Sequence, residues 1–139
     1  MKIRRYHPND LAPVIALWQA CGLTRAWNNP QLDIERKQSV QPEWFLVGEL
    51  DQKIVASAMF GYDGHRGWVN YLAVAAQHRR HGHARALMAH GEALLQAADC
   101  PKLNLQLRNS NAQALAFYQR LGYVEDDVRC LGKRLIADN

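Results

Sequence analysis

The sequence predicts a mixed α/β fold in a single domain, with a mostly antiparallel sheet, one parallel strand pair and four flanking helices. Three observations lead to this prediction. The 139 residues suit one hydrophobic core. Apolar residues switch between the helical and the strand period along the chain. Residues 68–108 run strand, long amphipathic helix, strand, which is the pattern of a parallel βαβ unit.

The N-terminal region predicts a short strand and two helices. The strand covers residues 2–6, and Asn9 or Asp10 is placed to cap the helix that follows. Gly22 is expected to end that helix, and Pro30 suits the first turn of a second helix that runs to about residue 40. The buried face of the first helix repeats at the helical period, with Leu11, Val14, Ile15, Trp18 and Cys21.

The middle of the chain predicts an antiparallel meander. Residues 44–50 and 53–60 form a hairpin around a tight turn at Asp51 and Gln52, and a glycine-rich polar loop leads to a strand at 68–74. A long helix at 82–98 follows. The strand at 102–108, the helix at 111–121 and a closing pair of strands between 123 and 136 complete the predicted order. That order is β-α-α-β-β-β-α-β-α-β-β.

Bulk composition narrows the class of protein. Apolar residues make up 48% of the chain and charged residues 22%, an ordinary globular balance, and no apolar run is long enough to span a bilayer. Residues 1–8 are too polar for a signal peptide, so we expect a cytoplasmic protein without a membrane partner. Three widely spaced cysteines indicate free thiols. A net charge of +4 is too mild to indicate nucleic-acid binding.

Basic residues gather immediately before the long helix, and this cluster indicates an anion site. The helix begins at Gly82 with no capping side chain just before it, so its first backbone N–H groups need other partners. A bound anion can supply them, aided by the helix dipole, although a basic loop with water at the helix start is the alternative. No acidic residue or cysteine is spaced as a metal ligand here, so no metal is expected. The cluster consists of His78, Arg79, Arg80, His81 and His83.

Two motifs resemble signatures of the GCN5-related N-acetyltransferase (GNAT) superfamily. The first is Arg79-x-x-Gly82-x-Ala84, directly after a strand that ends Leu-Ala-Val. The second is Asn111-x-x-Ala-x-x-Phe-Tyr-x-x-x-Gly-Tyr123. They occur in the family's order and at its separation, and the element order fits over the whole chain. The resemblance therefore implies the GNAT fold, in which the parallel pair splays around acetyl-CoA.

Further segments resemble a subfamily of uncharacterised bacterial acetyltransferases, which suggests no substrate. They are Trp27-Asn-x-Pro, Asp33-Ile-Glu-Arg-Lys, Gly61-Tyr-Asp-Gly-His-Arg-Gly and Leu131-Gly-Lys-Arg-Leu. One departure stands out: many family members have glycine where this chain has Arg80. An L-residue restricts the loop's conformations, while the Arg80 side chain gains a route to a phosphate.

The resemblance implies an acetyl-CoA site on two segments. Tyr118 matches the family's general acid, and the backbone N–H of Val74 matches its oxyanion donor. Leu72 and Val74 would hold the pantetheine arm through backbone groups, and Asn111 would hydrogen-bond it. Packing in the core is the alternative role for Tyr118. The implied cofactor contacts are Leu72, Ala73, Val74, Arg79, Arg80, His81, Gly82, His83, Ala84, Asn111 and Tyr118.

The general base is less well defined. The run around Gln106 resembles ribosomal-protein N-terminal acetyltransferases, which carry a glutamate at that position, and glutamine cannot act as a base. His65 and Asp63 are the base candidates, since they lie in a glycine-flanked loop before the central strand and His65 has a suitable ordinary pKa. A simple turn at Asp63 is the alternative. The other acidic candidates for the base are Glu49, Asp33 and Glu35. Asp33 and Glu35 could also line the acceptor side.

These expectations define an N-acetyltransferase that moves an acetyl group from acetyl-CoA to a primary amine by direct attack in a ternary complex. The acceptor is a small molecule, a peptide or a protein. The alternative is a GNAT-fold module that binds acetyl-CoA without turnover. Three tryptophans, Trp27, Trp44 and Trp68, are candidates for a pocket or for the face of a homodimer.

Overall fold

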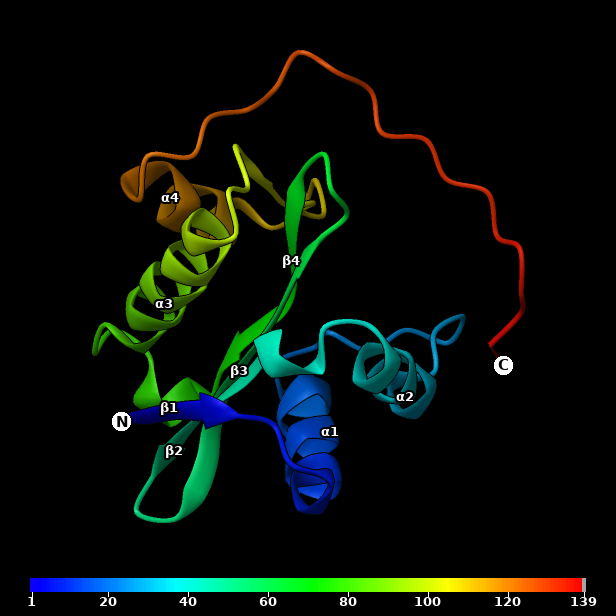
Figure 1. Ribbon diagram of the computed structural model, residues 1–139. Helices are drawn as coiled ribbons and strands as arrows, with labels where there is room; N and C mark the ends of the chain where they lie inside the picture. Colours follow the sequence, from blue (N-terminus) through cyan, green and yellow to red (C-terminus); the bar gives the residue numbers. More distant parts are fainter. Residues whose placement is uncertain (139) are drawn as a thin grey trace. The chain divides into compact units, whose positions relative to one another are not determined.

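A computed structural model describes residues 1–138 of the chain (Figure 1). Its strands are β1 (Lys2–Arg5), β2 (Phe45–Leu50), β3 (Lys53–Tyr62), β4 (Gly67–Val74) and β5 (Leu103–Asn104). Its α-helices are α1 (Leu11–Ala20), α2 (Pro30–Ser39), α3 (His83–Ala97) and α4 (Ala112–Arg120). Short 3-10 turns cover Pro8–Asp10, Pro42–Trp44 and Ala76–His78. The predicted fold class is confirmed.

The strands follow one another in the sheet in chain order, β1-β2-β3-β4-β5. The first three pairings are antiparallel. The last is parallel, because α3 carries the chain from the end of β4 back to the start of β5. The βαβ unit expected from the sequence is therefore present, and the basic loop lies where its crossover helix begins.

Alternation along the strands builds a core on each face of the sheet. Phe45, Val47 and Met59 face α1 and pack with the fully buried Trp18. The neighbouring Phe60 faces the other way, where α3 crosses it at Gly91. Figure 1 accordingly shows α1 and α2 on one side of the strands and α3 on the other.

Two predictions about strands need correction, as does the predicted cap of the first helix. No strand occurs at 123–136 within the described residues, whose apolar side chains there are exposed, 92% for Leu131. The segment lacks the strict period-two alternation of a half-buried strand, and Asp126 and Asp127 interrupt it. The strand expected at 102–108 covers only residues 103–104.

Asp10 precedes α1 as expected but does not cap it through its side chain. Its carboxylate instead accepts the backbone N–H of His7 at 2.8 Å and pairs with Arg4 at 2.8 and 3.0 Å. For a carboxylate that is 93% buried, the ion pair with Arg4 is a stronger attraction than a helix N–H group, which explains why Asp10 does not cap α1. Of the three tryptophans, Trp27 is half exposed, while Trp44 and Trp68 are partly buried.

The chain forms two compact units, residues 1–105 with Asp138, and residues 106–137. The first holds the sheet with α1, α2 and α3, and the second holds α4. Across the residues that the structure describes, no helix combines the length and apolar character needed to cross a bilayer.

Candidate functional site

The start of α3 has no side-chain cap. Gly82 occupies the N-cap position with a positive φ of 81°, and no side-chain hydrogen bond caps the helix there. A Cβ at this position would meet nothing within 4 Å, so the space in front of the helix is open. An uncapped helix start that presents backbone N–H groups to open space is suited to bind an anion.

Arg79 anchors the beginning of this loop to the end of β4. Its Nε atom donates to the carbonyl oxygen of Val74 at 3.0 Å, and its Nη2 atom lies 3.6 Å from the Sγ atom of Cys21. The thiol of Cys21 donates to the same carbonyl at 3.4 Å. A guanidinium has five N–H donors, so this anchoring still leaves donors for a phosphate.

Arg80 adopts a left-handed backbone conformation with a φ of 65°. Residues with a Cβ rarely take this conformation, and glycine takes it readily. The backbone at this position therefore has a conformation that suits glycine, and the strain is borne by an exposed arginine.

Histidines surround the helix start. The ring of His83 lies 6.5 Å from that of His78 and 6.0 Å from that of His81, measured between centroids. Burial lowers the pKa of His83, and the positive charges of the N-terminal amine, His81 and His78 add to the effect. These effects favour the neutral form of His83, whereas a nearby anion would favour its protonated form. No cluster of three metal-binding side chains occurs among residues 1–138.

β4 contains a β-bulge three residues before its end. Tyr71 and Leu72 together stand opposite Ala58, because Asn70 pairs with Met59 and Ala73 with Ser57. Tyr71 has a φ of 54°, the left-handed conformation that lets a strand bend at a bulge. No pattern of residues indicates this bulge.

Beyond the bulge, one edge of β4 is open. The parallel pairing with β5 is limited to Gly67 and Trp68 among the described residues. On the other edge, the N–H of Ala75 donates to Val55 of β3 at 2.8 Å. Successive residues of a strand point their N–H groups to opposite edges, so the N–H of Val74 points to the open edge. A backbone donor without a β5 partner thus lies five residues before the basic loop.

A buried chain of hydrogen bonds links the bulge to α1 and α2. Trp18 Nε1 donates to Ser57 Oγ at 2.8 Å, and Ser57 Oγ donates to the Tyr71 carbonyl at 3.0 Å. The Tyr71 ring stacks on Trp18 with centroids 3.7 Å apart. Its hydroxyl donates to Asp33 Oδ2 at 2.6 Å. Burial, followed by the bond to Asp33, raises the pKa of Tyr71 above its ordinary value.

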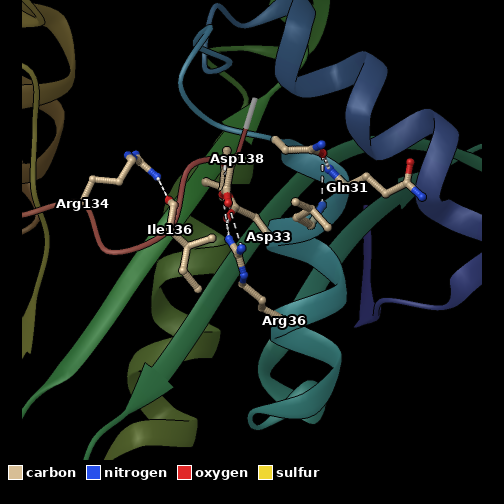
Figure 2. A network of polar contacts seen from close by, with 9 residues as sticks. Gln31, Asp33, Arg36, Arg134, Ile136 and Asp138 are labelled. Carbon is tan, nitrogen blue, oxygen red and sulfur yellow. Dashed lines mark hydrogen bonds and ion pairs between the residues drawn. The ribbon is translucent and has the colours of Figure 1, made fainter.

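Asp33 lies beside a second carboxylate that holds the nearby arginine. Arg36 donates to Asp138 through two nitrogens, at 2.7 and 2.9 Å, and contacts Asp33 Oδ1 only at 3.5 Å (Figure 2). Asp138 is 94% buried, whereas 27% of the Asp33 side chain is exposed. The bidentate pair therefore commits Arg36 to Asp138. The sequence does not predict this network, because no pattern of residues indicates that α2 contacts β4 or Asp138.

α4 carries Asn111 and Tyr118 in the second unit. Asn111 caps α4, with its Oδ1 accepting the N–H of Ala114 at 3.1 Å. Tyr118 is 94% buried, between the rings of Phe117 and Tyr123. Burial raises the pKa of Tyr118 to about 12. Protonating a thiolate of ordinary pKa from such a phenol costs about 5 kcal/mol instead of about 2 kcal/mol, so transfer needs a thiolate whose pKa is raised as well.

The base candidates differ in their surroundings. Asp63 forms a turn: its Oδ1 accepts the N–H groups of His65 at 2.8 Å and Arg66 at 2.7 Å, and Trp68 Nε1 reaches its Oδ2 at 3.4 Å. These bonds lower the pKa of Asp63, which makes it a weaker base. His65 is exposed in the same turn. Glu49 is bound by Arg4 at 2.9 Å. Gln106 donates to Cys130 in the second unit.

The fold and this site together define an α/β domain in which an uncapped helix start follows a strand edge with little pairing. The sequence profile of the Acetyltransferase (GNAT) family matches residues 12–123. The chain belongs to this family. It is 47% identical over 138 residues to an acetyltransferase of Yersinia pestis strain Pestoides F, covering 99% of this chain and 98% of that protein. An acetyltransferase of Sodalis glossinidius is 46% identical over 139 residues, with the same coverage.

Solved structures support the same family. Ard1 from Thermoplasma volcanium has a TM-score of 0.77 and 27% identity, covering 88% of this chain and 82% of that one. The ribosomal-protein-S18-alanine N-acetyltransferase from Escherichia coli has a TM-score of 0.73 at 24% identity, covering 90% and 78%, and shows the shared fold. The protein is therefore an acetyltransferase by family, and its acceptor is not fixed by these relatives.

Proposed function

We propose that the protein transfers an acetyl group from acetyl-CoA to a primary amine, by direct attack in a ternary complex. The observation that carries the proposal is the open edge of β4 beside the uncapped start of α3. This arrangement offers a backbone donor at Val74 and an anion site at Gly82 on one continuous segment. A thioester carbonyl and a pyrophosphate are the two groups of acetyl-CoA that need such partners.

The cofactor roles follow along this segment. Leu72, Ala73 and Val74 would hold the pantetheine arm, and the Val74 N–H would stabilise the oxyanion. Preorganised donors of this kind contribute roughly 3 kcal/mol to a transition state. The pyrophosphate would lie on residues 79–84, where backbone N–H groups and basic side chains converge. No metal is required for these steps.

Tyr118 is proposed as the general acid for the leaving thiolate, and Asn111 as a partner of the pantetheine arm. The match of both residues to the family signature supports these roles. The family profile spans both compact units, which supports one acetyltransferase domain over residues 1–139. His65 remains a base candidate, while the turn bonds of Asp63 favour a structural role for that residue.

The proposal extends to location and partners. We expect the protein to act in the cytoplasm on a small-molecule, peptide or protein amine, without nucleic acid or membrane. Its relatives include an enzyme named for a ribosomal-protein alanine and another named for aminoglycosides, so amine acceptors of different size suit this fold. A homodimer stays open, with the half-exposed Trp27 as a candidate contact.

The cofactor assignment is tested by calorimetry with acetyl-CoA. Gly82→Asp places a carboxylate at the anion site and should abolish binding, whereas unchanged affinity would refute the assignment. Arg79→Ala should weaken CoA more than a pantetheine thioester without the nucleotide, because the side chain serves the phosphates. Equal losses would indicate that Arg79 acts only through the Val74 carbonyl.

Turnover separates an enzyme from a binding module. Acetyl-CoA consumption is followed over polyamines, amino acids, aminoglycosides and peptides. We expect transfer to at least one amine, and a loss of about 100-fold in kcat for Tyr118→Phe with the affinity for acetyl-CoA retained. Acetyl-CoA binding without turnover, unaffected by Tyr118→Phe, would favour the non-catalytic alternative.

A further inference from the structure

We infer that Asp33, held in place by Tyr71, binds a positively charged group of the acceptor, so that the substrate is an amine carrying a second cation. This inference rests on the proposed acetyl transfer, because it assigns the other substrate of the same site. Asp33 is the anchor, and Tyr71 is a positioning residue that acts through it.

The location of Tyr71 links the anchor to the reacting end of the site. Tyr71 precedes Val74 by three residues on β4, which places the two roughly 10 Å apart along the strand. The bulge turns Tyr71 toward α1 and α2, where its hydroxyl meets Asp33 at 2.6 Å. The amine that attacks the acetyl carbonyl at the Val74 N–H and a cation at Asp33 would then be the two ends of one extended acceptor.

The geometry around Asp33 leaves it able to bind a cation. Its Oδ2 accepts the Tyr71 hydroxyl, which fixes the carboxylate, and its Oδ1 is contacted by Arg36 only at 3.5 Å. Arg36 is committed to the buried Asp138 by two short bonds. Arg36 thus contacts both carboxylates but binds Asp138 at the shorter distances, and Asp33 is the more exposed of the two. An ammonium group can add to Oδ1 without displacing Tyr71.

The rigid support of Tyr71 makes this position selective. Its ring stacks on Trp18, which is fully buried, and its carbonyl accepts from Ser57, which is also fully buried. A charged group fixed by packing discriminates by distance as well as by charge. The second cation stays protonated at Asp33, while the attacked amine at the far end must be neutral. An extended diamine fits both demands.

Matched amines test the anchor directly. Hexamethylenediamine and hexylamine differ in a single terminal ammonium group, and each is titrated onto the full-length protein in the presence of CoA and tested as an acceptor with acetyl-CoA. Because the only ammonium of hexylamine can itself occupy Asp33, the preference is measured as kcat/KM, in which we expect the diamine to exceed hexylamine at least about tenfold, since a hydrogen bond to a charged group is worth that much. Equal kcat/KM values would overturn the proposal.

Variants locate the effect on Asp33. Asp33→Asn keeps the shape and the bond to Tyr71 but should remove the diamine preference, and Tyr71→Phe should reduce it in part. Asp51→Asn makes the same change at an exposed position in the turn between β2 and β3 and should leave the preference intact. Thermal unfolding and the affinity for acetyl-CoA, measured for each variant, verify that the fold and the cofactor site persist. Retention of the preference in Asp33→Asn would sink the proposal.

Turnover with the same two amines separates this inference from the proposed reaction. If both amines are acetylated with equal kcat/KM, the transferase proposal stands and the anchor is wrong. If the diamine binds in an Asp33-dependent manner and acetyl-CoA binds, yet no amine in a wider panel is acetylated, the anchor stands and the transferase proposal fails. A diamine preference in kcat/KM that disappears in Asp33→Asn supports both.

Discussion

Gly91 is the position where α3 makes its closest approach to the sheet, and Gly91→Ala measures how tightly the helix is seated. A Cβ at this position would overlap the Cζ, Cε1 and Cε2 atoms of Phe60, whereas carbon atoms normally stay about 3.5–4.0 Å apart. Phe60 is fully buried, so its ring cannot swing into solvent. Either α3 or the ring must move.

Two opposing effects determine how much Gly91→Ala changes the free energy of unfolding. Replacing glycine by alanine inside a helix favours folding by about 1 kcal/mol, while forcing an extra methyl into a packed core costs about 1–3 kcal/mol or more. Overlap with three ring atoms places this case at the upper end. The net result is a loss of about 2 kcal/mol, or about 7 °C in Tm for a chain of this length.

Denaturant and thermal unfolding measure this change, with two controls. Ala89→Gly, at an exposed site of the same helix, should lower stability by about 1 kcal/mol and so report the helix preference without the clash. Phe60→Leu combined with Gly91→Ala should lose less than the sum of the single changes, because the smaller side chain makes room. A Tm that is unchanged or raised in Gly91→Ala would refute this picture of the α3 packing.

Three further predictions concern charge and backbone conformation. Arg80→Gly should change the free energy of unfolding by less than about 1 kcal/mol, because relief of the left-handed strain is offset by the freedom of glycine in the unfolded chain. A several-fold loss of CoA affinity in calorimetry would then indicate that the Arg80 side chain contacts a phosphate. CoA should bind more tightly as the pH falls from about 7.5 to 5.5, since a bound phosphate favours protonated His83. The CoA affinity of His83→Gln should depend less on pH. An unchanged pH dependence would exclude His83 from the site. Asp10→Asn should cost about 2 kcal/mol near neutral pH. Because Arg4 lowers the pKa of Asp10 in the folded protein, its contribution is present above the unfolded pKa and lost in acid, so urea midpoints of the two proteins should converge below about pH 4.

The sequence predicted those elements whose residues carry their own local signal. α1 and α3 have apolar faces at the helical period, and Gly22 and Gly82 mark a helix end and a helix start with the positive φ values that the structure shows. The basic loop could be placed at the start of α3 for the same reason, because the lack of a capping side chain is visible in the sequence.

The C-terminal region lacked such a signal. Residues 123–136 contain enough apolar side chains to suggest strands, yet a strand requires an edge to pair with, and pairing is not a local property. The shortness of β5 has the same origin: Leu103, Leu105 and Leu107 alternate as in a strand, but only the first falls within one.

The sequence predicted the proposed cofactor half of the candidate site better than the acceptor half, and the reason is physical. The proposed cofactor half lies mostly on the continuous segment from Leu72 to Ala84, so spacing within one segment was enough to predict most of it. The acceptor half depends on Asp33 and Tyr71, which are 38 positions apart and meet only because a β-bulge redirects one strand residue toward α2. No periodicity signals a bulge, since it consists of one extra residue in an otherwise regular strand. The residues that distinguish one acceptor from another are therefore to be sought along the network that supports this bulge, beginning with Asp33.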